Sequence, residues 1–258
     1  MSRLALAARF VLGGVSVRVR ADARPPRLRR LLARWEAFPA WPRRRARLAY
    51  DLLARPRRPR LVLNGYSYRR AVEPEDLVDL LEYEVCTRVP ALTRAVPLHA
   101  AALVRDERAL LLVGPSGAGK STLARALVER GFGYVSDEQV YLGPGGAVEG
   151  MPRAIGLDGQ ARAWPVPRAL VAQAPVRAER AVFLAPGRWP GAPLEPLSAA
   201  EALARLLAAC LRPPRRGDAE ALAAFAARCA PLSLACEGVE EAAALLCAEA
   251  AARLSSAS

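Results

Sequence analysis

Hydrophobic positions along this chain form short apolar runs and helical stripes that follow one another. The runs at 96–104 and 109–113 are almost wholly apolar, as in strands that are buried on both faces. The polar turn at 105–108 between them predicts a hairpin. Shorter apolar runs predict further strands at 61–63, 133–136, 139–142, 181–184 and 232–234.

Helices are predicted where leucine, valine and alanine recur every three or four positions. Such stripes occupy 75–89, 121–130, 198–211, 218–229 and 239–254. Gly131 follows the second stripe as a stop signal, and Ser198 with Glu201 forms a capping box at the start of the third. Strands and helices in this order predict an α/β fold with a mixed sheet and flanking helices.

The N-terminal part of the chain has a different pattern. Residues 10–20 alternate weakly, as in an edge strand or a hairpin, and proline-rich turns interrupt the segment that follows. We expect two domains: an arginine-rich region over 1–90, which is a candidate substrate-recognition lobe, and a second domain over 91–258.

The positive charge of the chain is concentrated in its N-terminal part. The formal net charge is +13, and residues 1–60 hold 17 arginines against three acids, with the densest clusters at 27–30, 43–45 and 55–60. Such a surface attracts an acidic peptide, a nucleic acid or an anionic membrane. The alternative is a solvated face in a chain that uses arginine for nearly every positive charge. No DNA- or RNA-binding motif accompanies the clusters, so we expect no nucleic-acid partner.

The chain has 37 arginines and a single lysine, and this lysine lies in a glycine-rich loop. Residues 114–121 read Gly-Pro-Ser-Gly-Ala-Gly-Lys-Ser, which matches the phosphate-binding pattern G-x-x-x-x-G-K-[ST] at every fixed position. Arginine is a rigid planar fork, whereas Lys120 is a compact ammonium on a flexible stem that can reach between phosphates. An apolar strand precedes the loop and a helical stripe follows it, as this kind of site requires. We therefore expect the loop to bind the phosphates of ATP.

The residues expected to hold ATP are consecutive in the sequence. They are Gly114, Pro115, Ser116, Gly117, Ala118, Gly119, Lys120, Ser121 and Thr122. The backbone N–H groups of the loop and the positive end of the following helix would surround the phosphates. The Ser121 hydroxyl is a candidate ligand for Mg²⁺. A glycine-rich turn without a ligand is the alternative.

Two adjacent acids, Asp137 and Glu138, follow the predicted strand at 133–136 and come 17 residues after Lys120. The carboxyl edge of a parallel sheet is where a nucleotide binds, so these acids should face the terminal phosphate. One carboxylate can hold Mg²⁺ while the other accepts a proton from an attacking hydroxyl. The alternative is a pair of acids in a polar turn.

His99, the only histidine, lies in the apolar run at 96–104. A histidine in such a strand is more often a hydrogen-bonded core residue than a catalytic one. Its strand, however, is predicted to pair with the strand that leads into the loop. This pairing would put the imidazole within reach of the phosphates.

The order of these elements resembles the catalytic domain of HPr kinase/phosphorylase. The resemblance is carried by His99, the loop at 114–121, Gly131 and the pair Asp137-Glu138. The chain also resembles a group of shorter HPr-kinase-related kinases, which include lasso-peptide tailoring kinases. Weaker motifs carry this second resemblance at 80–83, 98–101, 151–155, 183–186 and 196–201, so that it covers roughly residues 60–255.

The resemblance implies a nucleotide-binding fold shared with phosphoenolpyruvate carboxykinase, and ATP and Mg²⁺ as cofactors. It implies that Lys120 holds phosphates, that Asp137 is the base for the acceptor hydroxyl, and that His99 lies beside this base. Ser121 and Glu138 would hold Mg²⁺, with Glu138 standing where the family more often has a second aspartate. The signature of true HPr kinases near 149–157 is not legible, and the first 90 residues do not match that family's regulatory domain. HPr itself is therefore not the expected acceptor.

These expectations combine into an ATP-dependent kinase that phosphorylates a serine-type hydroxyl of a peptide or protein, such as a ribosomally made lasso-type peptide. A small-molecule hydroxyl kinase and a nucleotide-gated binding protein without phosphotransfer are the alternatives. A transport ATPase is disfavoured because no LSGGQ-like signature follows the loop.

The expected location is the cytoplasm. No apolar run approaches the roughly 18–20 residues of a membrane span, and the five cysteines show neither C-x-x-C nor metal-site spacing, as in buried thiols. The sequence leaves open whether the protein forms a homo-oligomer.

Overall fold

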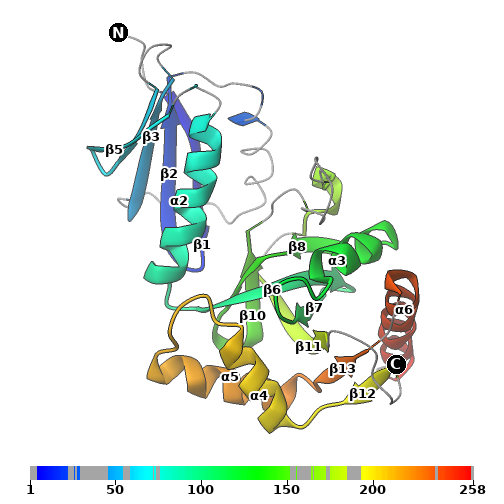
Figure 1. The fold of residues 1–258 in the computed structure, drawn as a ribbon. Coiled ribbons are helices and arrows are strands. Elements are labelled where there is room, and N and C mark those ends of the chain that lie inside the picture. The colour runs from blue at the N-terminus through cyan, green and yellow to red at the C-terminus, as the bar shows by residue number, and fades with distance from the viewer. Residues whose placement is uncertain are drawn as a thin grey trace. The chain divides into compact units, whose positions relative to one another are not determined.

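The computed structural model describes residues 5–22, 26, 28–29, 46–54, 59–71, 73, 76–151, 155, 164, 166–172, 175–184, 193–235 and 238–256. The chain divides into two compact units, Met1–Arg94 and Ala95–Ser258. Each unit combines a sheet with helices (Figure 1), so the expected class, a mixed sheet with flanking helices, is confirmed.

The N-terminal unit contains a five-stranded sheet and the helix α2 (Asp76–Leu92). In their order across the sheet, the strands are β1 (Ala5–Leu12), β2 (Val15–Ala21), β3 (Leu48–Leu53), β4 (Arg60–Leu63) and β5 (Tyr66–Arg70). β1 and β2 form an antiparallel hairpin, and β2 pairs with β3 in parallel. The weak alternation at 10–20 is thus a hairpin whose first strand lies at the sheet edge.

Alternation along β2 separates apolar from charged side chains in this unit. Val17 and Val19 are buried, whereas Arg18 and Arg20 lie on the other face of the strand. Arg20 donates hydrogen bonds to both carboxylate oxygens of Asp51 on β3, which raises the pKa of the guanidinium. Most of the arginine clusters expected to form a basic surface, including 43–45 and 55–58, lie outside the described residues.

The C-terminal unit contains an eight-stranded mixed sheet in the order β10-β9-β6-β7-β11-β13-β12, with β8 also paired to β6. β10 pairs with β11 as well as with β9, so the sheet curls back on itself. Its strands are β6 (Val96–Arg105), β7 (Arg108–Val113), β8 (Gly133–Ser136), β9 (Gln139–Leu142), β10 (Ala147–Gly150), β11 (Val176–Leu184), β12 (Leu194–Pro196) and β13 (Leu232–Leu234).

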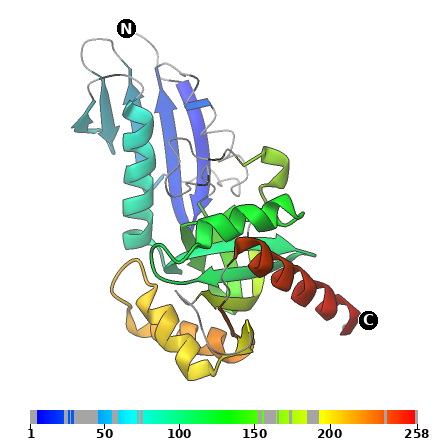
Figure 2. The same ribbon diagram turned by 45° about the vertical axis from the view of Figure 1, so that its right-hand side comes forward.

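Helices cover both faces of this sheet (Figure 2). α3 (Lys120–Glu129) and α6 (Val239–Ser256) share one core with it, and α4 (Ala199–Ala208) and α5 (Arg216–Arg228) share the other. The central strand β6 supplies both cores, because Leu98 and Ala100 face α4 and α5 while Ala101 and Leu103 face α3 and α6. The apolar runs therefore belong to strands that are buried on both faces, as the sequence predicts.

The hairpin and the five helices predicted from the sequence are confirmed, with one informative difference at the end of α4. The helical stripe predicts a helix to residue 211, yet α4 ends at Ala208. The next residues pair with the start of β6 instead: the His99 N–H donates to the Ala209 carbonyl, and the Leu211 N–H donates to the Pro97 carbonyl. This pairing places the end of α4 beside His99.

Four short strands, β3, β5, β10 and β12, were not predicted from the sequence. β12 reads Leu-Glu-Pro and has no apolar run, so only its antiparallel pairing with β13 makes it a strand. In the described part of the chain, no helix is both long and apolar enough to cross a lipid bilayer.

Candidate phosphate-binding site

The glycine-rich loop leaves the end of β7 and enters α3 directly. Gly117 and Gly119 have φ values of +78° and +84°, a left-handed conformation that glycine adopts without strain. A Cβ atom on Gly114 would lie 3.2 Å from the Leu184 carbonyl oxygen at the end of β11. The path of the backbone therefore favours glycine at 114, 117 and 119, of which the pattern fixes the first and the last.

The loop leads directly into the N-terminus of α3. The first N–H groups of a helix have no partner within the helix and carry a positive partial charge. The residue that precedes α3 is Gly119, which supplies no side-chain cap. The first turn, which contains Lys120, Ser121 and Thr122, thus has the properties of a phosphate-binding helix start.

Lys120 is folded into the loop. Its side chain is buried, and Nζ donates hydrogen bonds of 2.8 Å to the carbonyl oxygens of Gly114 and Pro115. Burial lowers the pKa of the ammonium, and the nearby carboxylates of Glu138 and Asp137 act in the opposite direction. The only lysine and the acidic pair, which the sequence singles out separately, are therefore close enough to interact electrostatically.

The two acids lie in the short gap between the end of β8 and the start of β9. β8 and β9 both run antiparallel to the same edge of β6, with Ser136 beside Ala102 and Gln139 beside His99, so that Asp137 and Glu138 fall between the paired residues. The register against β6 is the same on both sides of the acids, and its one shift lies earlier, between Ala102 and Leu103, where one extra residue of β8 forms a bulge. The sequence places the acids at the end of a strand in a parallel sheet, and this detail is wrong because β6 lies antiparallel between β7 and the acids.

The antiparallel strand nevertheless brings the loop and the acids to the same level. Ala100 of β6 pairs with Val113, the last residue before the loop, on one side. The gap between β8 and β9, at 137–138, lies opposite 100–101 on the other side of β6. β7 lies two strand spacings, or about 10 Å, from β8 and β9. The start of the loop and the acids therefore lie on opposite sides of β6, two strands apart.

Asp137 is held in place by groups that the sequence reading missed. The carboxylate is buried and accepts a 2.7 Å hydrogen bond from the Tyr134 hydroxyl. Ser136 Oγ accepts from the Gln139 N–H and donates to the Met151 carbonyl, which fixes the turn around the acids. A Cβ on Gly150 would lie only 2.6 Å from Ser136 Cβ, so glycine is required there. Tyr134, three residues before Asp137, carried no sequence signal of this role.

His99 lies beside both the lysine and the acids. Burial lowers the pKa of the imidazole, and the charge of Lys120 lowers it further, whereas Glu138 and Asp137 raise it. The net pKa is below the ordinary value of 6.5, so the ring is neutral at neutral pH. The structure thus brings together the three side chains expected to be catalytic, while their roles remain predictions.

The single imidazole makes this arrangement directly testable by NMR. The Cε1–H signal of His99 should titrate with a midpoint below 6.5, and Lys120→Ala should raise the midpoint because a nearby positive charge is lost. Because the folded protein binds this proton less readily than the unfolded chain, the free energy of unfolding should decrease as the pH falls from 6.5. His99→Asn should remove that decrease. A midpoint unchanged by Lys120→Ala would contradict the proximity of the two groups.

The residues predicted to hold Mg²⁺ fit one mode of binding only. In the described ranges, no group of three or more His, Cys, Asp or Glu side chains is arranged to hold a metal ion. Mg²⁺ usually binds through one or two carboxylates together with substrate phosphates and water. A hydroxyl from Ser121 and a carboxylate from Glu138 suit an ion that arrives with a nucleotide.

A cavity of about 490 Å³ opens on the α4 side of the loop. Its walls are His99, the loop start at 113–116, Phe183 and Leu184 of β11, and Arg205 with 208–210 at the end of α4. We call it the loop-side cavity. A smaller cavity of about 80 Å³ lies around Arg105 and Arg180, away from the loop.

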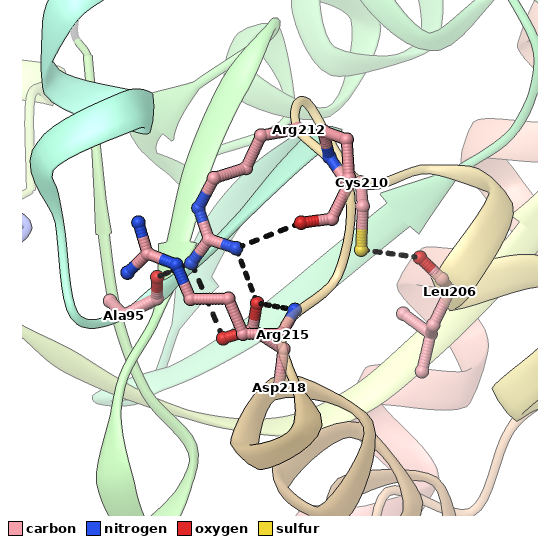
Figure 3. A network of polar contacts seen from close by, with 7 residues as sticks. Ala95, Leu206, Cys210, Arg212, Arg215 and Asp218 are labelled. Atoms are coloured by element: carbon pink, nitrogen blue, oxygen red, sulfur yellow. Dashed lines mark hydrogen bonds and ion pairs between the residues drawn. The ribbon is translucent and has the colours of Figure 1, made fainter.

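A buried ion pair anchors the wall formed by the end of α4 (Figure 3). Arg212 donates to both carboxylate oxygens of Asp218 and to the Ala95 carbonyl, and Asp218 also accepts from the Arg215 N–H. Burial acts to raise the pKa of Asp218, but these hydrogen bonds outweigh it and hold the pKa below its ordinary value. The segment after Cys210 is thereby tied to both α5 and the start of β6.

The described cysteines, Cys86, Cys210, Cys229 and Cys247, form no disulfide bond with one another. Of these four, Cys229 is fully buried, and Cys236 lies outside the described residues. Burial raises the pKa of Cys210 and raises that of Cys229 to about 11, so both thiols stay protonated at neutral pH.

Similarity to known proteins is found among solved structures. No family model and no curated protein matches the chain. Among solved structures, the HPr(Ser) kinase/phosphatase from Coxiella burnetii is 25% identical, with a TM-score of 0.32, and the match covers 39% of this chain and 73% of that one.

Proposed function

We propose that this protein is an ATP-dependent phosphotransferase of the HPr-kinase-like type, acting on a serine-type hydroxyl of a peptide or protein. One observation carries the proposal: the glycine-rich loop with the only lysine and the buried Asp137 lie at the same level on either side of β6. A binding site for phosphates needs the loop alone. A carboxylate across from the loop is what a transfer reaction adds, because the acceptor must lose a proton.

In the proposed reaction, the acceptor oxygen forms a bond to the γ-phosphorus as the bond from that phosphorus to the β,γ-bridging oxygen breaks, and ADP leaves. Asp137 accepts the proton of the acceptor hydroxyl, and Tyr134 orients its carboxylate. Lys120 moves from its loop carbonyls to the phosphate oxygens and offsets their charge. Mg²⁺ bound with the nucleotide through Ser121 and Glu138 would neutralise further phosphate charge.

The test is transfer from γ-labelled ATP with Mg²⁺. Incubation with serine-containing peptides, including a lasso-type precursor, should give a labelled peptide whose label is a phosphoserine by mass spectrometry. Asp137→Asn should give none. ATP binding without transfer to any peptide or to water would instead identify a nucleotide-gated binding protein.

A small-molecule hydroxyl kinase is the second candidate. The loop-side cavity favours it, because about 490 Å³ is within the range of small-ligand sites. Free hydroxy amino acids included in the same labelling assay separate the two: a labelled small molecule with unlabelled peptides would select this candidate. In either case we propose that the protein acts in the cytoplasm, where ATP is available.

A further inference from the structure

Among the described residues that line the loop-side cavity, Arg205 is the one side chain with a fixed charge. The cavity's other walls are the loop start, apolar residues of β11 and α4, Cys210 and His99. Arg205 contributes to this lining from the last turn of α4, and among the residues that the structure describes no carboxylate does so. The cavity therefore favours an anion over a neutral or cationic group.

The guanidinium of Arg205 contacts an aromatic ring. Its Cζ lies 5.9 Å from the centre of the Phe183 ring, and Phe183 pairs with Val113, the residue before the loop. Stacking on an aromatic face holds an arginine while leaving the N–H groups at its edge to donate. The guanidinium thus lies over the residue of β11 that pairs with the last residue before the loop.

Glu201, the acid nearest to Arg205 in α4, is hydrogen-bonded to another residue. Glu201, four residues earlier, accepts hydrogen bonds from both the N–H and the hydroxyl of Ser198 in the capping box of α4. It acts on Arg205 only as a more distant charge, and no ion pair joins Arg205 to a carboxylate within the part of the chain that the structure describes. Glu201 is fully exposed, so water screens this interaction.

We infer that Arg205 binds an oxyanion in the loop-side cavity, next to the start of the glycine-rich loop. This inference rests on the proposed function and adds a second fixed positive charge to the site. The oxyanion has two sources, the terminal phosphate of the nucleotide and an acidic group of the acceptor or phosphorylated product. Both present the planar or tetrahedral oxygens that a guanidinium binds with paired N–H groups.

The experiment measures binding to the full chain by calorimetry with three probes: ADP, a non-hydrolysable ATP analogue, and inorganic phosphate added to the ADP complex. Arg205→Met should leave the affinity for ADP within about twofold. It should weaken binding of the analogue, of inorganic phosphate, or of both by roughly tenfold to a hundredfold, the range for a lost charge-assisted hydrogen bond. Loss with the analogue assigns the oxyanion to the nucleotide, whereas loss with inorganic phosphate alone assigns it to the acceptor or product.

Two variants control for charge and for folding. Arg205→Lys keeps the charge but lacks the paired N–H donors of a guanidinium, so it should give an intermediate loss of affinity. Arg216→Met removes an arginine whose side chain is 97% exposed on α5 and should change none of the three affinities. Thermal unfolding confirms that each variant is folded before binding is compared.

The inference and the proposed function fail in different ways. If the wild-type protein binds ADP but Arg205→Met keeps the affinities for the analogue and for inorganic phosphate within twofold, the inference is overturned and the arginine only stabilises the end of α4. If the wild-type protein binds no ADP, the proposed function fails first and the inference falls with it.

Discussion

Lys120→Ala should abolish both phosphotransfer and tight nucleotide binding, whereas Asp137→Asn should abolish transfer alone. The alanine variant removes the cation that lies inside the loop, so ATP affinity should fall by roughly tenfold to a hundredfold. The transfer rate should fall by about two to three orders of magnitude. Asp137→Asn keeps the shape of the side chain and its contact with Tyr134, but loses the proton acceptor, which is typically worth about 10²–10⁴ in rate.

The single lysine makes the binding half of this prediction easy to measure. An amine-selective reagent modifies only Lys120 and the terminal amine, so protection by ATP reports occupancy of the loop directly. Lys120→Arg is the matched control: it keeps the charge and should still lose most of the transfer rate, because a planar fork does not fit between the phosphates. Full transfer activity in Asp137→Asn would show that another group is the base.

Arg212→Ala should be the most destabilising single change in the cavity wall, lowering the free energy of unfolding by about 3–5 kcal/mol. The side chains of Arg212 and Asp218 are 11% and 7% exposed, so truncation leaves a buried carboxylate without its main partner. Denaturant unfolding measures the loss. The exposed Arg216→Ala should change stability by less than about 0.5 kcal/mol.

The same ion pair should contribute to stability in acid. Because the pKa of Asp218 in the folded protein is below its ordinary value of 3.8, its stabilisation is present above that pH and is lost as the pH falls through the folded-state pKa. Asp218→Asn should therefore reduce stability at neutral pH and flatten the acid side of the profile. An Arg212→Ala loss below about 1 kcal/mol would show that the pair is not needed to hold this segment.

How far the sequence predicts this protein depends on the range of the interactions involved. The hairpin of β6 and β7, the capping box at Ser198 and the stop at Gly131 depend on neighbours within a few residues, and each appears in the structure. The premature end of α4 does not follow from its own residues, because the pairing of 209–211 with β6 overrides the helical stripe. Short strands such as β12 likewise exist only through their partners.

The candidate site also combines features set by neighbouring residues with features set by distant segments. The sequence by itself determined the glycine-rich loop and its lysine, because left-handed glycines, the helix start and the reach of Lys120 are properties of one continuous segment. Only the tertiary structure decided that β6 lies antiparallel between the loop and Asp137, that Tyr134 holds this carboxylate, and that Arg205 lies over Phe183. These juxtapositions depend on strand pairing and helix packing between distant segments, which hydrophobic periodicity does not encode.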